Sequence, residues 1–233
     1  MSSTTNKWPK PMPELSEEQV RIREDFMRYF HEIYSTSYGA VAKFNHTYPL
    51  ATARPGIRTL EVGAGLGEHL DFEDASRQDF VALELRDEMA AVIQEHHPEA
   101  STHVGDIEAG TDLEDASFDR VIAIHVLEHL RNLPAALDEV RRVLKPGGIF
   151  EIVIPCEGGL GYTLGRQVTS RRVFEKRYGM SFDWYIESEH FNTPGEIVPQ
   201  LDARFTRVRR TWWPLRVPTV HLNLCLGLSY RRT

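Results

Sequence analysis

A glycine-rich turn near residue 60 constrains the fold of this chain more than any other feature. The segment Thr59–Leu70 begins with apolar residues typical of a strand and continues into Gly63, Gly65 and Gly67. Glycine tolerates a positive φ and, because it has no Cβ, lets a ligand approach the main chain closely. A helix directly after the turn would point free N–H groups toward that ligand. The segment therefore predicts a strand, a turn and a helix arranged around a ligand.

The spacing of these glycines indicates the charge of the ligand. A dinucleotide-binding G-x-G-x-x-G sequence would place its third glycine at position 68, where this chain has Glu68. The order here is E-x-G-x-G-x-G, with Glu61 at the end of the predicted strand. A carboxylate at that place suits a cationic ligand and disfavours a pyrophosphate. A nucleotide-cofactor oxidoreductase is therefore the less favoured alternative.

In this segment the chain resembles the class I S-adenosylmethionine-dependent methyltransferases, whose first motif has the same form. The resemblance covers about residues 57–155 and includes Leu-Glu-His-Leu at 127–130 and Leu-Lys-Pro-Gly-Gly at 144–148. It implies S-adenosyl-L-methionine as the cofactor, a sulfonium that also carries an ammonium group. It further implies an enzyme that methylates an oxygen or nitrogen of a small molecule. A non-catalytic scaffold that only binds S-adenosylmethionine is a second alternative.

Strand and helix patterns alternate from residue 57 onward, which predicts right-handed βαβ units in a mostly parallel sheet. The expected strands lie at 57–62, 80–85, 102–105, 118–125 and 149–154, with helices at 87–97 and 134–144. A further helix begins at the cap residue Thr193, and segments 205–213 and 221–230 would form a C-terminal antiparallel hairpin. With the resemblance, this predicts an α/β, Rossmann-like class I methyltransferase fold with a seven-stranded, mostly parallel sheet and helices on both faces.

The 233 residues, 41% of them hydrophobic, suffice for one sizeable core but are few for two domains. Residues 1–15 are rich in proline and polar residues and are expected to form a flexible leader. Residues 16–56 are predicted to form N-terminal lid helices, the first opening with a capping box of Ser16 and Gln19. Residues 57–233 would form the methyltransferase domain, with a substrate insertion at about 156–192.

Acidic residues at the ends of two further strands complete the predicted cofactor site. Glu84 follows the glycine turn by about twenty residues, the distance at which a carboxylate binds ribose hydroxyls in parallel-sheet nucleotide sites. The resemblance implies that Asp106 bonds the adenine amino group and that Ile107 packs on the adenine ring. The expected cofactor-binding residues are Glu61, Gly63, Ala64, Gly65, Gly67, Glu84, Leu85, Asp106, Ile107 and His125.

Histidines after the fourth predicted strand raise the question of a metal. His125, Glu128 and His129 match the H-x-x-E-H spacing of some zinc proteases. His125 closes an apolar strand, however, so the two histidines would lie on different elements, and no metal is expected. His125 is a candidate general base, because an imidazole can accept a proton near neutral pH, although packing against the cofactor is an equal alternative. His190 is a second candidate base, and His129 is expected to bond within the start of its helix.

Charge is unevenly distributed along the chain. Residues 166–216 hold ten Lys and Arg against six Asp and Glu, a net charge of +4, whereas residues 1–165 have a net charge of −13. Focused positive charge in the insertion would attract an anionic small molecule, such as a sugar or natural-product intermediate. The acidic residues 1–165, which include the predicted cofactor site, do not suit a protein that binds nucleic acid. The candidate acceptor-binding residues are Tyr34, Tyr162, Arg166, Arg171, Arg172, Trp184 and Tyr185.

The cysteines and the apolar segments indicate the cellular compartment of the protein. Cys156 and Cys225 lie far apart and have no metal-ligand spacing, which predicts free thiols in a reducing compartment. The first residues lack the apolar core of a signal peptide, and no apolar run reaches the length of a membrane span. The cytoplasm is therefore the expected location, and the sequence makes no prediction of oligomeric state.

Overall fold

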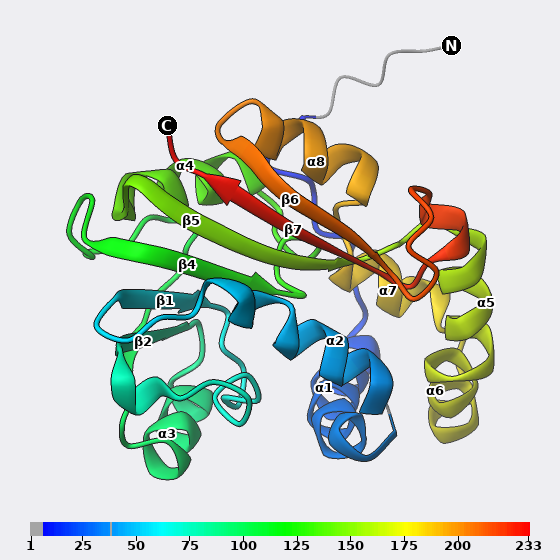
Figure 1. Cartoon of the computed structure of the whole chain (residues 1–233). Helices are drawn as coiled ribbons and strands as arrows, with labels where there is room; N and C mark the ends of the chain where they lie inside the picture. Colours follow the sequence, from blue (N-terminus) through cyan, green and yellow to red (C-terminus); the bar gives the residue numbers. More distant parts are fainter. Residues whose placement is uncertain (1–6, 38) are drawn as a thin grey trace.

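A seven-stranded sheet organises the protein in the order β3-β2-β1-β4-β5-β7-β6 (Figure 1). The computed structural model describes residues 7–37 and 39–233, without the side chains of residues 30–37. The strands are β1 (Arg58–Val62), β2 (Asp79–Glu84), β3 (Ser101–Val104), β4 (Phe118–Ile124), β5 (Leu144–Pro155), β6 (Thr206–Trp213) and β7 (Cys225–Arg231). The first five strands in this order, β3, β2, β1, β4 and β5, pair in parallel. Strand β7 pairs antiparallel with β5 and β6. The predicted fold class and C-terminal hairpin are confirmed.

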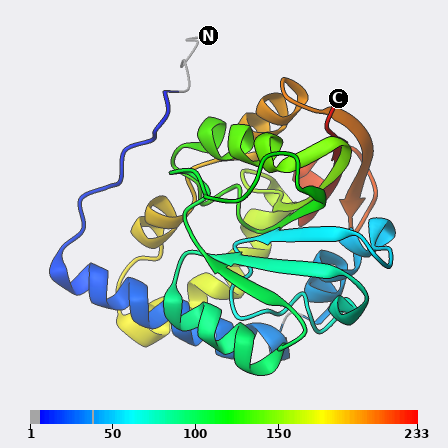
Figure 2. The ribbon, with the colours of Figure 1, turned by 90° about the vertical axis from the view of Figure 1, so that its left-hand side faces the viewer.

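One face of the sheet is apolar, because alternate strand residues point to the same side. Leu60 of β1, Val121 of β4 and Ile152 of β5 belong to one buried cluster on this face. Helices α4 (Leu133–Val143) and α8 (Pro194–Asp202) cover it with Leu137 and Ile197, which are fully buried. Figure 2 shows these two helices on one side of the sheet, with α1 and α3 on the other.

The opposite face of the sheet carries buried polar side chains. Arg120 of β4 donates through Nη2 to Glu73 Oε2 (2.9 Å) and to the carbonyl of Pro49 (2.8 Å), and through Nη1 to Glu73 Oε1. Glu73 also bonds His69 Nε2 at 2.9 Å. Burial alone would raise the pKa of Glu73, but the bonds from His69 and Arg120 lower it to about 2. Helix α3 (Asp87–His96) and the short helices η1 (Pro49–Thr52) and η2 (Ala75–Arg77) lie in the connections on this side.

A second cluster of polar side chains joins the N-terminal region to the C-terminal hairpin. Ser229 of β7 donates to buried Glu151 of β5 at 2.7 Å, and Arg209 of β6 donates to Ser229 at 3.2 Å. The Arg209 guanidinium also lies over the Tyr48 ring, 4.0 Å from its centroid. That ring packs on Gly227, where an added Cβ would come within 2.6 Å of it. Tyr48 thereby holds the end of helix α2 (Gly39–Thr47) on the sheet.

An aromatic cluster joins helix α1 (Glu17–Ser37) to the insertion, which forms helices α5 (Leu160–Val168), α6 (Ser170–Tyr178) and α7 (Asp183–Glu189). Phe26 of α1 packs with Phe174, Phe182 and Tyr185, with ring centroids 4.9 to 6.1 Å apart. The views in Figures 1 and 2 place α1 beside these insertion helices. The two regions predicted as lid and insertion thus share one core.

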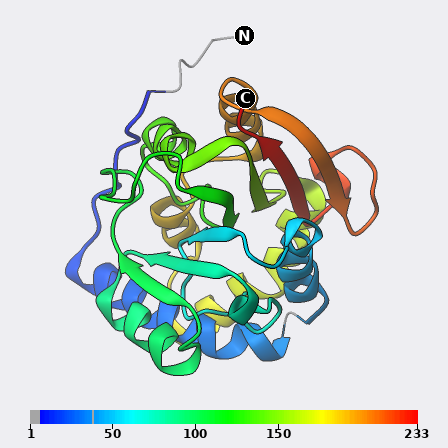
Figure 3. The ribbon, with the colours of Figure 1, turned by 60° about the vertical axis from the view of Figure 1, so that its left-hand side comes forward.

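The predicted helix caps are confirmed, and the described part of the leader lies against the domain. Ser16 and Gln19 bond each other's main-chain N–H groups at the start of α1, and Thr193 and Glu196 form the capping box of α8. Residues 7–15 have no helix or strand, and Figure 3 shows them as an extended trace that leads to α1. Lys10 N–H donates to the carbonyl of Arg131, Arg131 Nε donates to the carbonyl of Lys10, and Lys10 Nζ donates to the carbonyl of Phe191. Residues 1–6 of the predicted leader lie outside the described residues.

The prediction of a helix directly after the glycine turn is wrong. Residues 65–73 form consecutive turns, in which Gly67 N–H bonds the carbonyl of Ala64 and Leu70 N–H bonds that of Gly67. This segment reaches β2 through η2 and keeps His69 and Glu73 in the buried polar group. Smaller differences occur elsewhere: β5 begins at Leu144 rather than 149, and β7 begins at Cys225, after a short helix η3 (Val220–Leu222).

Candidate cofactor and acceptor site

The glycine turn lies at the carboxyl ends of the parallel strands, the usual edge for ligands in such sheets. Gly63, Gly65 and Gly67 have φ of +65°, +61° and +90°, a region that other residues rarely adopt. A Cβ at Gly63 would come within 2.7 Å of Val126, in the segment that follows β4. The turn therefore requires glycine both for its backbone conformation and for its close contact with that segment.

Glu84, at the end of β2, supports the glycine turn. Its Oε2 accepts from Gly65 N–H at 3.0 Å, and its Oε1 accepts from Arg86 N–H at 3.2 Å. The side chain is buried, yet each carboxylate oxygen has a second lone pair. The sequence prediction placed Glu84 correctly beside the turn but did not anticipate that it bonds the turn directly.

Glu61 is the clearest indication that a cation fits here. Its side chain is 3% exposed, and its Oε2 has no hydrogen-bond partner among the described residues. Burial and the nearby carboxylates of Glu68 and Glu73 raise the pKa of Glu61 well above its usual range. A bound cation would offset both effects and favour the carboxylate form.

The residues predicted to contact adenine differ in exposure. Asp106 is exposed, and its Oδ1 accepts from Glu108 N–H at 2.8 Å. Leu85 is 62% exposed at the end of β2, whereas Ile107 is 6% exposed and belongs to the main core. Asp106 and Leu85 thus remain accessible to a ligand, while Ile107 mainly anchors the segment. Ala64 is buried in the smaller core cluster beneath the turn.

His125 adopts a strained conformation directly after β4. Its φ is +53°, which is uncommon for a residue other than glycine and often marks a functional position. Nδ1 lies 3.0 Å from Oε1 of Glu128, and the buried Nε2 has no partner among the described residues. Burial would raise the pKa of Glu128, but the bond from His125 outweighs it and holds the pKa below its usual range. An ionised Glu128 accepts from Nδ1–H, which leaves the lone pair of a neutral imidazole on Nε2.

His190 has a similar partner. Its Nδ1 bonds Oε2 of Glu157, whose other oxygen accepts from Arg166 of α5. Burial would raise the pKa of Glu157, but these two partners lower it below its usual range. The backbone carbonyl of Glu128 accepts from Phe191 and Asn192 N–H at 2.7 and 3.0 Å. The structure thus brings the two predicted bases to the same turn.

His129 connects the segment after β4 to helix α1 through Glu189. It precedes α4 in a turn, so the prediction that it bonds within its helix is wrong. Its Nδ1 is 3.6 Å from Glu189 Oε2, and its ring meets His190 edge-on, with centroids 4.8 Å apart. Glu189 also pairs with Arg23 of α1. Helix α1 is thereby tied to the turn of residues 125–129, which we call the histidine turn. Helix α1 also contacts the segment after β2, where Arg86 donates to Met27 Sδ at 3.0 Å.

The predicted acceptor residues lie in different surroundings. Tyr162 and Arg166 of α5 lie beside Glu157, with the Arg166 guanidinium 5.5 Å from the Tyr162 ring centroid. Trp184 and Tyr185 instead belong to the aromatic cluster that joins the lid and the insertion. Arg171 pairs with Asp183 and Glu175, whereas Arg172 is exposed. The side chain of Tyr34 lies outside the description.

Sequence reasoning missed the carboxylates that position the histidines. In the sequence, Glu128 stands out only as part of the zinc-protease spacing, and Glu157 lies in a glycine-rich segment that predicted no role for it. The signal for Glu128 was its spacing of three residues from His125, whereas the pairing of Glu157 with His190 has no local signal. Among the described residues, no group of His, Cys, Asp or Glu has an arrangement that could hold a metal ion. Cys156 and Cys225 are buried, free thiols.

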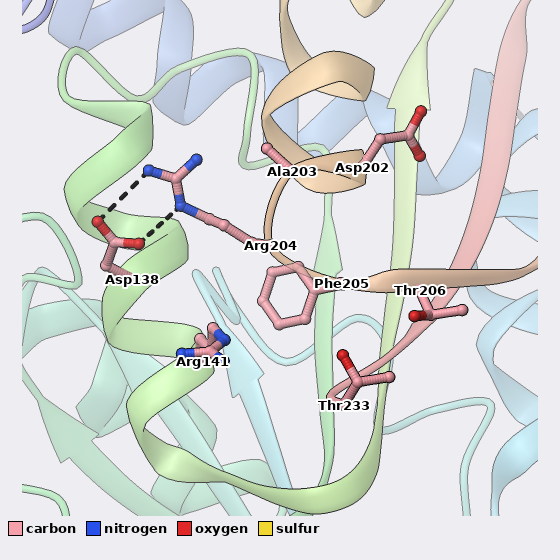
Figure 4. A pocket seen from close by; sticks show the side chains of 8 residues that line it. All are labelled: Asp138, Arg141, Asp202, Ala203, Arg204, Phe205, Thr206 and Thr233. Atoms are coloured by element: carbon pink, nitrogen blue, oxygen red, sulfur yellow. Dashed lines mark hydrogen bonds and ion pairs between the residues drawn. The ribbon is translucent and has the colours of Figure 1, made fainter.

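Two surface cavities lie outside this cluster of residues. One, of about 390 Å³, lies at the opposite edge of the sheet between α4, α8 and the end of the chain, where Arg204 pairs with Asp138 (Figure 4). The other, of about 360 Å³, is lined by Arg210, Thr211, Trp212 and Arg216 of β6 and the following loop. Neither contains a residue of the predicted cofactor site.

Comparison with known proteins agrees with this geometry. Residues 60–152 match the family model described as "Methyltransferase domain". The strand order, the glycine turn and the acidic strand ends agree with the fold of the class I S-adenosylmethionine-dependent methyltransferases, and the match over residues 60–152 supports that family.

The chain is 37% identical over 113 residues to malonyl-(acyl-carrier protein) O-methyltransferase of Erwinia pyrifoliae, covering 48% of this chain and 43% of that protein. It therefore spans less than half the length of this curated relative. A structure of 1,6-didemethyltoxoflavin-N1-methyltransferase from Burkholderia thailandensis superposes with a TM-score of 0.61 at 18% identity, covering 97% of this chain and 94% of that one. The cyclase SpnF superposes with a TM-score of 0.59 at 15% identity, covering 83% and 80%.

The residues present fit S-adenosylmethionine. The unpartnered Oε2 of Glu61 is a buried acceptor for an ammonium group, and Glu84 and Asp106 retain lone pairs for hydroxyl and amino donors. The positive-φ glycines leave the main chain of the turn open to close contact.

Proposed function

We propose that the chain transfers the methyl group of S-adenosylmethionine to an oxygen or nitrogen of a small molecule, and that His125 accepts the proton released. The observation that carries this proposal is the conformation of His125. Its backbone is held in the left-handed region, Glu128 fixes Nδ1, and the buried Nε2 has no partner among the described residues. Such an imidazole is oriented to accept a proton through Nε2.

The cofactor supplies a methyl group that is already activated by the sulfonium. The protein must therefore align the acceptor with the methyl group and exclude water. Helix α1 and the insertion share an aromatic core, and Arg23 and Glu189 connect α1 to the histidine turn. These contacts support the role of residues 16–56 as a lid over the site.

His190 is a second candidate for the base. Glu157 holds its Nδ1 as Glu128 holds that of His125, but Glu157 also binds Arg166. His190 therefore stands closer to α5 and to the proposed acceptor wall. Comparing the His125 and His190 variants assigns the proton acceptor.

An anionic sugar or natural-product intermediate is the acceptor class that the charge of the insertion supports. The ion pairs of Arg166 and Arg171 reduce the positive charge that each presents, so exposed Arg172 is the best placed to attract an anion. One of the relatives methylates a malonyl group on a carrier protein, as its name states.

Two measurements test the proposal. Calorimetry with S-adenosylmethionine and with NADH separates a methyltransferase from an oxidoreductase, and we expect binding of the first alone. Transfer of labelled methyl to a component of a metabolite extract separates catalysis from a binding scaffold. The similarity to SpnF makes this second test necessary, because that protein shares the fold and is named a cyclase. Cofactor binding without any labelled product would contradict the proposal.

A further inference from the structure

Exposed aliphatic side chains gather at one corner of the molecule. Eleven large hydrophobic side chains are exposed in the part of the chain whose side chains are described, and six of them lie on α5 or on the loop between β6 and β7. On α5 they are Leu160, Leu164 and Val168, which are 66%, 66% and 72% exposed. Their spacing of four residues places them on one face of the helix. On the loop they are Leu215, Val217 and Leu222.

These two segments pack against each other, so their exposed residues form one surface. Gly161 of α5 lies against the backbone of η3, where an added Cβ would be 3.2 Å from the carbonyl of His221. An added Cβ at Gly159, which precedes the helix, would overlap the carbonyl of Val220. Figure 1 shows the loop before β7 beside α5. We call the six exposed residues together the α5–loop surface.

The two segments that form this surface carry positive charges and no acidic residue of their own, although Arg166, Arg171, Arg207 and Arg209 pair with carboxylates of other segments. The sequence contains no Asp or Glu in 158–174 or in 206–224, although these segments contain seven arginines. Arg210 and Arg216 line the 360 Å³ cavity together with Trp212, and neither has a carboxylate within ion-pair distance among the described residues. The Arg210 guanidinium lies 5.6 Å from the Trp212 ring centroid. Two free guanidinium groups beside an aromatic wall suit a phosphate-bearing headgroup.

We propose that the α5–loop surface binds an anionic lipid bilayer, with Leu160, Leu164 and Val168 inserted among the acyl chains and the cavity of Arg210 and Arg216 holding a lipid phosphate. Protruding aliphatic residues beside arginines and tryptophan are the composition of interfacial segments that lie on a membrane without crossing it. No helix in the described part of the chain is long and apolar enough to cross a membrane.

A folded protein partner is less well matched to this surface. The aliphatic residues stand outward on a helix instead of lining a groove, and a fluid bilayer accepts such side chains without a complementary shape. Tyr162 and Arg166 lie on the other side of α5, beside Glu157. Binding through the α5–loop surface would therefore bring the candidate acceptor site close to the membrane.

Co-sedimentation of the full chain with lipid vesicles tests the proposal. We expect the wild-type protein to bind vesicles of phosphatidylcholine with about a third of phosphatidylglycerol, and to bind pure phosphatidylcholine far more weakly. Arg210→Gln with Arg216→Gln should weaken binding about fivefold per arginine, or about 25-fold together. Leu160→Ser, Leu164→Ser and Val168→Ser together should weaken it by about tenfold or more.

Matched controls change the same residue types elsewhere. Arg77→Gln with Arg141→Gln, and Val20→Ser with Val104→Ser, alter exposed residues outside the surface and should leave vesicle binding unchanged. All variants should keep their circular dichroism and their affinity for S-adenosylmethionine. A failure of the membrane proposal can therefore be told apart from a failure of the proposed methyltransferase function. A folded wild-type protein that ignores anionic vesicles would overturn the proposal, as would α5 or arginine variants that bind like the controls. Binding to an acidic protein but to neither kind of vesicle would also overturn it, in favour of a protein-docking surface.

Discussion

Replacing Glu73 by Gln should destabilise the fold by about 3–5 kcal/mol at neutral pH, because it leaves the buried Arg120 cation without its counter-charge. Arg120 is 1% exposed and Glu73 is 5% exposed. The pKa of Glu73 is about 2 in the fold against an ordinary value of 4.5. At 1.36 kcal/mol per pKa unit, this difference corresponds to about 3 kcal/mol of stability, in agreement with the first figure.

Urea unfolding as a function of pH measures this effect. Because folding lowers the pKa of Glu73, the stabilisation is complete above about pH 4.5 and is lost as the pH falls toward 2. The difference between wild type and Glu73→Gln should therefore shrink over that interval. Glu95→Gln on the exposed side of α3 is the control and should change the free energy of unfolding by less than about 0.5 kcal/mol. A loss below about 1 kcal/mol for Glu73→Gln at neutral pH would show that Arg120 does not depend on Glu73 as its counter-charge.

Three further predictions concern the cofactor, the packing and the acceptor. Asp106→Ala should weaken S-adenosylmethionine binding by about 10- to 150-fold in calorimetry, because a hydrogen bond to a charged group contributes about 1.5–3 kcal/mol; unchanged affinity would contradict its assignment. Gly227→Ala should cost about 1–3 kcal/mol in urea unfolding, because the new Cβ meets the Tyr48 ring at 2.6 Å, and an unchanged midpoint would show that the ring moves freely. Arg172→Gln should raise the Michaelis constant for an anionic acceptor more than Arg171→Gln does, since only Arg171 is paired with carboxylates in the described structure, and equal effects would contradict this distinction.

The sheet was predictable because its signals are local. Strands β1, β2 and β4 are short apolar runs that end in polar residues, and the caps at Ser16 and Thr193 are fixed by residues three positions apart. The path of residues 65–73, where the sequence predicted a helix, was not predictable, because it depends on Arg120, which lies far along the chain and fixes Glu73.

The site was predictable to a smaller extent. Strand ends place Glu61, Glu84 and His125 at one edge of a parallel sheet, and the structure shows them there. The pairing of Glu157 with His190 joins residues 33 positions apart through tertiary packing, so no local pattern reports it. The arginines of the insertion look alike in the sequence, and only the fold shows which of them are paired.

The proposed activity is the transfer of a methyl group, with the proton taken by a histidine at the end of β4. Its most direct test is the rate of labelled methyl transfer from S-adenosylmethionine to the acceptor for wild type and His125→Ala, with cofactor affinity measured on the same samples. We expect His125→Ala to lower turnover by about 10²–10⁴-fold while cofactor affinity stays near that of wild type. Nearly full turnover in His125→Ala, with methyl transfer as the slow step, would contradict this role of His125, and a loss of turnover in His190→Ala alone would assign the proton to His190.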